Sequence, residues 1–285
     1  MFGSVQALLS ASADKPLWQA VLDDDCQDRD VPAGNSLDKM AALWRAMKES
    51  VLDYDPTRRS PCGLSGGQGA QMAALDHSIC GPFIQEVIST ALKLGEHNAC
   101  MGRIVAAPTA GACGVLPAVL IPLQRRERLT DQQMVECLYV SAGFGQVIAT
   151  RASISGAEGG CQAEIGSASA MAAGALTALR GGSGEQIGHA SAMALKNLMG
   201  LVCDPIAGLV EVPCVKRNVI GAVNAVSCAD MALAGITSRV PVDEVIDCMG
   251  DVGRRLPPEL RETALGGLAA TPFGKSVKER MEREK

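Results

Sequence analysis

The chain has 285 residues, of which 47% are hydrophobic and only 3% aromatic, and its formal net charge is −5. A core of small and aliphatic side chains favours packed helices over a β-sandwich, and the charge and lack of aromatic residues argue against nucleic-acid binding. The eleven cysteines are an odd number in a chain too long for a small disulfide-stapled domain. No stretch resembles a membrane span or a signal peptide, so we expect a reduced, cytoplasmic protein.

The first 60 residues are predicted to form N-terminal helices. Ser4 is a candidate cap for the first helix, and Pro16 is suited to begin the second. A third helix is expected over residues 37–54, where apolar side chains recur on one face at helical spacing. We interpret this stripe as core packing.

Residues 55–69 are predicted to form a loop, because prolines and glycines prevent a regular element. The consecutive glycines of Ser65-Gly66-Gly67 expose backbone N–H groups that can receive a carboxylate, although a plain turn is the simpler interpretation from the residues alone. A helix is expected over residues 72–94, with an interruption near Gly81-Pro82. In the segment that follows it, we interpret His97 as a surface or loop residue.

The string APTAGACG, from residue 107 to 114, indicates a tight turn of small residues around Pro108. Further helices are expected over residues 116–123 and 132–148. Helix 162–179 is small or apolar on nearly all sides, which is typical of a fully buried helix. Helices are also expected over residues 184–200, 217–236, 242–255, 258–265 and 274–285, and the run SVKERMEREK is expected to be a solvated or frayed end.

Three cysteines lie among residues that break regular structure: Cys161 in SGAEGGCQAEIGSAS, Cys203 in GLVCDPIAG and Cys214 in VEVPCVKRN. Their separations of 42 and 11 residues differ from those of zinc ribbons and bacterial ferredoxins. Three converging thiolates could hold an iron–sulfur cluster in which one iron lacks a protein ligand. Taken alone, the residues fit inert buried cysteines better, since free cysteine is among the most buried residue types.

The strings SGAEGGCQAEIGSASAMAAGAL, MGLVCDPIAGLVEVPCVKRN and MGRIVAAPTAGACGVLPAVL resemble the catalytic part of the iron–sulfur-dependent L-serine dehydratases, over about residues 65–267. The resemblance implies a [4Fe-4S] cluster held by Cys161, Cys203 and Cys214, without pyridoxal phosphate. Its open iron would act as a Lewis acid in the conversion of L-serine to pyruvate and ammonia. The residues that the resemblance marks as substrate-binding are Ser65, Gly66, Gly67, Asn98, Thr109, Ala110 and Gly111.

Single-chain members of that family carry an additional N-terminal domain, and this chain starts near the boundary of the catalytic part. It therefore resembles the alpha subunit of the two-chain type, which implies a separate beta subunit in a heterodimer or a larger assembly. We assign the catalytic base to no residue of this chain, and the partner chain is one possible source of that base. The resemblance marks no catalytic role for His77, His97 or His189, and we interpret Glu158, Glu164 and Lys196 as structural, although they are closer to the cysteine strings.

We therefore predict an all-α fold with one helical catalytic domain over residues 1–285. It would comprise N-terminal helices in residues 1–60, the cluster and substrate region in 61–240 and C-terminal helices in 241–285, with the cluster cysteines at helix ends and in loops. We expect the protein to be sensitive to oxygen and to take part in amino-acid degradation and gluconeogenesis. The alternatives are a related lyase acting on L-cysteine or L-threonine, an electron-transfer iron–sulfur protein, and a non-catalytic helical protein.

Overall fold

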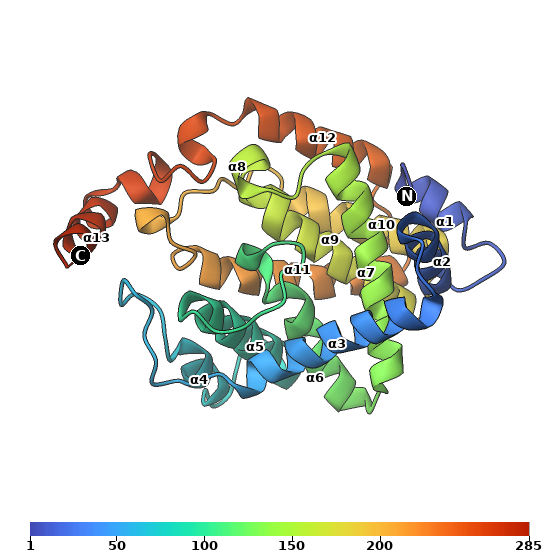
Figure 1. Cartoon of the computed structure of the whole chain (residues 1–285), viewed down its shortest axis with the longest axis horizontal. Helices are drawn as coiled ribbons and strands as arrows, with labels where there is room; N and C mark the ends of the chain where they lie inside the picture. Colours follow the sequence, from blue (N-terminus) through green and yellow to red (C-terminus); the bar gives the residue numbers. More distant parts are fainter. Residues whose placement is uncertain (285) are drawn as a thin grey trace.

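Helices make up most of the chain in the computed structural model, which describes residues 1–284 (Figure 1). The α-helices are α1 (Val5–Ser10), α2 (Leu17–Arg29), α3 (Ala33–Leu52), α4 (Gln68–Ala73), α5 (Gly81–Ala99), α6 (Val115–Glu127), α7 (Asp131–Arg151), α8 (Gly156–Gly159), α9 (Ser167–Leu179), α10 (Gly184–Asn197), α11 (Cys214–Leu233), α12 (Val242–Arg255) and α13 (Pro272–Arg283). Shorter turns are η1 (Ala110–Ala112), η2 (Gln162–Gly166), η3 (Ile206–Gly208), η4 (Pro258–Leu260) and η5 (Gly267–Ala270). Residues 1–284 contain no β-strand, so the all-α prediction is confirmed.

Helix α9 lies at the centre of the domain and packs against α6, α7, α10 and α11 (Figure 1). Every residue from Cys161 to Thr177 is buried, as the composition of this stretch predicts. Small side chains let the neighbouring helices approach closely. A Cβ atom on Gly174, for example, would lie 2.6 Å from Ser191 Oγ and 2.9 Å from the Phe144 ring.

Helix boundaries follow local signals at most positions. Capping boxes begin α7, with Thr130 and Gln133, and α10, with Ser183 and Gln186. Several elements differ from the sequence prediction. Helix α3 begins at Ala33, the helix expected over residues 72–94 is divided into α4 and α5, and the helix expected over residues 258–265 is only the short turn η4. Helix α5 continues through residues 95–99, where a loop was expected, and α11 begins at Cys214 rather than Arg217.

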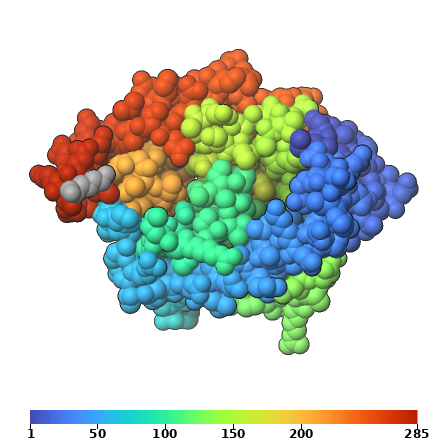
Figure 2. Space-filling view, viewed as in Figure 1, coloured from blue at the N-terminus to red at the C-terminus, as the bar shows by residue number. Residues whose placement is uncertain are grey.

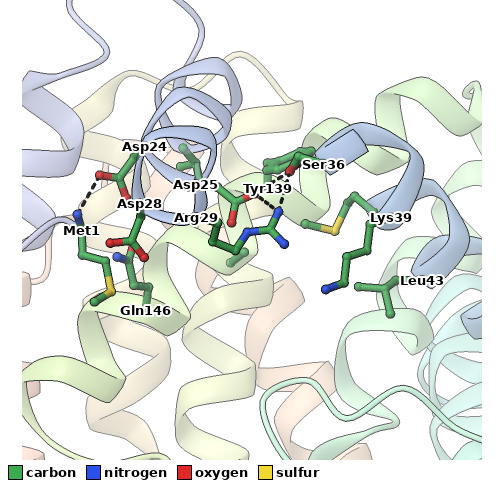
Figure 3. Close-up of a pocket in the computed structure, with 13 residues that line it drawn as sticks. Met1, Asp24, Asp25, Asp28, Arg29, Ser36, Lys39, Leu43, Tyr139 and Gln146 are labelled. Atoms are coloured by element: carbon green, nitrogen blue, oxygen red, sulfur yellow. Dashed lines mark hydrogen bonds and ion pairs between the residues drawn. The ribbon is translucent and has the colours of Figure 1, made fainter. Parts of the chain in front are cut away.

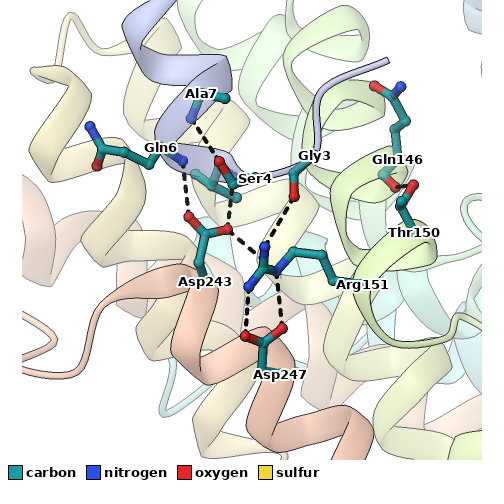
Figure 4. Close-up of polar contacts among 10 residues, drawn as sticks. Gly3, Ser4, Gln6, Ala7, Gln146, Thr150, Arg151, Asp243 and Asp247 are labelled. Atoms are coloured by element: carbon teal, nitrogen blue, oxygen red, sulfur yellow. Dashed lines mark hydrogen bonds and ion pairs between the residues drawn. The ribbon is translucent and has the colours of Figure 1, made fainter.

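Polar contacts of Arg151 join the beginning of the chain to α12 (Figure 4). The guanidinium at the end of α7 donates to Asp247 at 3.0 and 2.6 Å and to the Gly3 carbonyl at 3.0 Å. Asp243 accepts from the Val5 N–H at 2.8 Å, at the start of α1. One arginine therefore fixes three segments that are far apart in sequence.

The C-terminal helix α13 packs onto the loop around residue 60 and the segment around residue 206 (Figure 2). Val277 is buried against Cys62 and Ile206, and the Arg280 guanidinium donates to the Cys62 carbonyl. The run SVKERMEREK, expected to be solvated or frayed, is mostly exposed over residues 276–284 but helical as far as Arg283, so it is solvated and not frayed; Lys285 lies outside the described residues. The sequence of α13 is strongly charged, and the helix is docked by Val277, by the half-buried Met281 and by Arg280.

A pocket of about 330 Å³ opens between α2, α3 and α7 (Figure 3). Several of its polar groups pair with one another: Asp25 accepts from Arg29 and from Ser36 at 2.5 Å each, and the Ser36 hydroxyl lies 2.7 Å from that of Tyr139. None of the residues that the sequence marks for substrate or cluster lines this pocket.

Candidate functional site

The three cysteines of the sequence strings lie at helix ends or in extended loop, as predicted. Cys161 directly precedes η2, Cys214 is the first residue of α11, and Cys203 forms an isolated bridge with Arg261. All three are buried, with exposed fractions of 2%, 6% and 2% respectively, and none forms a disulfide. The Gln162 N–H donates to the Leu201 carbonyl at 2.9 Å and so holds the Cys161 turn against the Cys203 loop.

The cysteine thiols are close enough to change one another's protonation. A hydrogen bond from the Cys203 thiol is the largest cause that lowers the pKa of Cys161, and the same bond raises the pKa of Cys203. Burial raises the pKa of Cys214 to about 12, and the charge of Cys161 contributes to the rise. The fold therefore brings together three cysteines that are separated by up to 53 positions in the sequence.

A largely buried ion pair, between Arg217 and Asp204, lies beside these thiols. The Arg217 guanidinium lies 2.9 Å from Asp204 and donates to the Val202 carbonyl at 2.7 Å, and its positive charge contributes to the lowered pKa of Cys161. Asp204 accepts the Leu268 N–H at 2.8 Å. Arg217 thus places a positive charge near the Cys161 sulfur, which favours its thiolate form, while Asp204 ties the Cys203 loop to the C-terminal segment.

The Thr109 turn meets the cysteine segments through Glu164. The Thr109 hydroxyl donates to Glu164 Oε1 at 2.6 Å, and Glu164 Oε2 lies 4.0 Å from Cys203 Sγ. Burial is the largest cause that raises the pKa of Glu164, with a further contribution from the charge of Glu262. A Cβ atom on Gly156 would lie 2.7 Å from Glu164, 3.0 Å from Glu262 and 3.2 Å from Cys203 Sγ, so a glycine is needed where these groups converge.

The remaining residues of the Thr109 turn are held by two asparagines. Asn98 Nδ2 donates to the Ala110 carbonyl at 3.2 Å. Asn218, which is buried, donates to the carbonyls of Gly111 and Cys214 at 2.8 and 3.0 Å. Asn218 therefore links the turn directly to the start of α11.

The Ser65-Gly66-Gly67 loop lies against the end of α5, where the Gly66 N–H donates to Glu96 at 3.1 Å. The Ser65 N–H donates to the Ser60 hydroxyl at 3.1 Å, and that hydroxyl donates in turn to the buried Glu211. Glu211 lies three positions before Cys214. The loop is thus connected to the cysteine segments through Ser60 and Glu211, and its substrate role stays a prediction.

His97 is buried on α5 with an exposed fraction of 6%, so its interpretation as a surface or loop residue is wrong. Its Nε2 atom has no hydrogen-bond partner among the described residues. The helix continues past Leu94 and carries this side chain inward against Gly102. Of the other side chains weighed as bases, His77 and Glu158 are exposed, and Lys196 donates to Ser238.

Sequence patterns did not reveal the residues that fasten the loops: Glu96, Asp204, Glu211, Arg217 and Asn218. All five are polar, and most of their partners lie 13 or more positions away in the sequence. An exception is the contact between Asn218 and the Cys214 carbonyl at the start of α11. The sequence feature that could have pointed to these residues is their position within or beside the three strings that resemble the family. A charged residue among small and apolar ones suggests a buried partner.

Residues 1–284 contain no group of three histidine, cysteine, aspartate or glutamate side chains arranged to hold a single metal ion. A four-iron cluster binds each thiolate through a different iron, so its ligands are spaced more widely than those around one ion. No helix in the described part of the chain is long and apolar enough to cross a membrane.

Comparison with known proteins identifies the family of this chain. The family described as serine dehydratase alpha chain matches residues 12–269, and the chain therefore belongs to that family. A probable L-serine dehydratase alpha chain of Bacillus subtilis (strain 168) is 52% identical over 225 residues, covering 78% of this chain and 75% of the relative. That of Latilactobacillus sakei is 54% identical over 193 residues, covering 68% and 92%. The L-serine dehydratase TdcG of Escherichia coli (strain K12) is 46% identical over 239 residues, which is 80% of this chain but 53% of that relative.

Proposed function

We propose that this chain is the catalytic alpha subunit of an iron–sulfur-dependent L-serine dehydratase, which converts L-serine to pyruvate and ammonia. The observation that carries the proposal is the convergence of three buried cysteine thiols beside the Thr109–Glu164 contact. The printed names of the relatives, two of them probable L-serine dehydratases and one an L-serine dehydratase, support the substrate.

The donor set fits an iron–sulfur cluster. Cys161, Cys203 and Cys214 would hold it, since soft thiolates are the usual ligands of such clusters. When bound, a [4Fe-4S] cluster with one iron free of protein ligands supplies a Lewis acid. The Arg217 guanidinium favours the thiolate form at Cys161 and would offset part of the negative charge. We propose no role for pyridoxal phosphate.

Other side chains would prepare the site for the amino acid. Glu164 accepts the Thr109 hydroxyl hydrogen bond and so fixes the direction in which Thr109 presents its oxygen. Asn98 and Asn218 hold the carbonyls of Ala110 and Gly111 and keep this turn in place. Burial of the thiols excludes water from the site. The substrate roles of Ser65, Gly66, Gly67, Asn98, Thr109, Ala110 and Gly111 belong to the proposal.

The base that removes the Cα proton is not assigned to this chain. The printed name "alpha chain" of the relatives from Bacillus subtilis and Latilactobacillus sakei supports a separate beta chain. We propose that the beta chain completes the site, in a heterodimer or a larger assembly. A cytoplasmic location, oxygen sensitivity and a part in amino-acid degradation and gluconeogenesis are further elements of the proposal.

The test is anaerobic reconstitution of the alpha chain with iron and sulfide, together with a beta chain, followed by an assay of the 2-oxo acid product, which is pyruvate from L-serine or L-cysteine and 2-oxobutyrate from L-threonine. L-Serine, L-cysteine and L-threonine are compared as substrates, and a sample treated with an iron chelator is the control. We expect a brown protein that forms pyruvate from L-serine faster than from L-cysteine. A colourless protein, or a brown one without activity towards L-serine, would contradict the proposal.

A further inference from the structure

The carboxylate of Glu96 is buried at the end of α5, with an exposed fraction of 1%. Its Oε1 atom accepts the N–H groups of Gly66 at 3.1 Å and Gln68 at 2.9 Å. Its Oε2 atom accepts the Gly69 N–H at 3.1 Å and the Tyr54 hydroxyl at 2.7 Å. The carboxylate thus has a donor for each of four lone-pair positions.

These contacts determine which way the glycine loop faces. Successive backbone N–H groups form a concave site for an anion, and here the anion is a side chain of the same protein. Burial and the contact with Glu96 raise the pKa of Tyr54, so its hydroxyl stays protonated as a donor. A buried carboxylate that lost its donors would be left unpaired at high cost. Glu96 is therefore a permanent part of the loop rather than a group that substrate displaces.

The loop also has little freedom to shift away from Glu96. Gly66 has φ 134°, and a Cβ atom there would lie 2.2 Å from the Arg58 carbonyl. A Cβ atom on Gly69 would lie 2.5 Å from the Lys93 side chain. Both glycines are needed so that the loop can approach its neighbours closely.

The same helix end holds the second predicted substrate segment. Asn98, two positions after Glu96, donates to the Ala110 carbonyl. The last turn of α5 therefore fastens the Ser65–Gly67 loop with one side chain and the Thr109–Gly111 turn with another. The relative position of the two segments is set by this turn.

We propose that Glu96 is a positioning residue for the substrate: it fixes the Ser65-Gly66-Gly67 loop in the position in which this loop and the Thr109–Gly111 turn receive the amino acid. This inference rests on the proposed function. Because Glu96 acts through the loop and not on the reacting atoms, its loss should weaken substrate binding more than turnover.

The test compares Glu96→Gln with wild type in the reconstituted two-chain protein. Glutamine has nearly the same shape, but it offers only one acceptor oxygen to the N–H groups. We expect amide hydrogen exchange of residues 66–69 to accelerate roughly tenfold. We expect the KM for L-serine to rise roughly tenfold while kcat changes by less than about threefold, with the cluster absorbance unchanged. Tyr54→Phe, which removes one of the donors, should give a smaller change of the same kind.

Glu86→Gln is the matched control, because Glu86 lies on the same helix and pairs at the surface with Arg125. It should change neither exchange nor KM. Unchanged hydrogen exchange in Glu96→Gln would overturn the proposal that Glu96 holds the loop. Faster exchange with an unchanged KM would overturn the role of Glu96 in substrate binding. A lower KM would mean that Glu96 competes with substrate. If the wild-type complex does not act on L-serine, the proposed function fails, and the role of Glu96 in substrate binding fails with it. The exchange measurement would still show whether Glu96 holds the loop.

Discussion

Helix α9 and the loops around the cysteines are both buried, but they are stabilised in different ways. Along α9, small side chains pack against four neighbouring helices, and the helix satisfies its own backbone hydrogen bonds. The loops lack that internal pairing. They make some backbone hydrogen bonds across segments, such as that from the Cys203 N–H to the Leu260 carbonyl, and buried charged or polar side chains bind further N–H and carbonyl groups, among them Glu96, Asp204, Glu211 and Asn218.

The difference shows where the fold specifies function. Small changes of volume should damage the α9 region, because its interior has no spare space. In the loop region, loss of a single charge should matter more, because it leaves a buried partner unpaired. The substitutions below separate these two kinds of dependence.

The largest effect is expected for Cys203→Ser, which removes a thiolate from the loop region. We expect the brown chromophore and the dehydratase activity to fall to background after anaerobic reconstitution, because a cluster with two thiolate anchors is not retained. The control is Cys248→Ser, at an exposed cysteine on α12. Equal loss of chromophore in the two variants would show that Cys203 has no special role.

A large loss of stability is expected for Asp204→Asn. The substitution leaves the Arg217 guanidinium buried without its carboxylate, and breaking a buried pair in this way costs about 3–5 kcal/mol. Asp251→Asn, which breaks exposed contacts with Arg254 and Arg255, should cost about 0–1 kcal/mol. Urea unfolding of the two variants gives the comparison, and similar midpoints would argue against a stabilising role for the buried pair.

A smaller effect is expected for Gly174→Ala in α9. The added methyl group would meet Ser191 and the Phe144 ring, and overpacking of this kind costs about 1–3 kcal/mol. Gly34→Ala in α3 is the matched control, because no atom lies within 4 Å of the added Cβ. It should stabilise the protein by about 0.5–1 kcal/mol through helix propensity. If both substitutions shift the midpoint of thermal unfolding in the same direction, α9 is less tightly packed than its contacts indicate.

The smallest effect concerns pH and His97. Burial is the largest cause that lowers the pKa of His97; the charge of Arg58 lowers it further, while Asp53 and a hydrogen bond to the Arg103 backbone raise it. Because the pKa of His97 is lower in the folded chain, the unfolded chain binds a proton more readily. The contribution of neutral His97 to the free energy of unfolding is therefore full at pH values above the ordinary pKa of 6.5, and it is lost as the pH falls below 6.5.

His97→Gln should therefore reduce the difference in unfolding free energy between about pH 7.5 and pH 5.5. His77→Gln, at an exposed position, should leave that difference as in wild type. Urea unfolding at both pH values checks the prediction. A pH dependence in His97→Gln equal to that of wild type would mean that His97 does not carry it.

Much of the fold could be predicted from the sequence because helical signals are local. The apolar stripe of α3, the small residues of α9 and the cap before α7 are all visible in short windows. The end of α5 was misjudged because residues 95–99 contain polar side chains that are typical of a loop. They are helical because Glu96 and His97 are buried against other segments.

The site could be predicted in part, through its resemblance to a family. The cysteines and the Thr109 turn stand in recognisable strings, and the structure brings them together. The fastening residues could not be found in this way, because Glu96 lies 27 to 42 positions from its partners and Asn218 lies 107 positions from Gly111. Such pairs depend on the folded path of the chain and not on any local pattern.

The central claim is that the fastened loops surround a cluster that binds the substrate. Mössbauer spectroscopy tests this most directly, with the exchangeable iron labelled by a Mössbauer-active isotope in the active complex, before and after addition of L-serine. We predict that saturating L-serine changes the signal of the labelled iron, and that Glu96→Gln requires more L-serine to produce the same change. A signal that stays unchanged at saturating L-serine would contradict the account, because the cluster would then be structural.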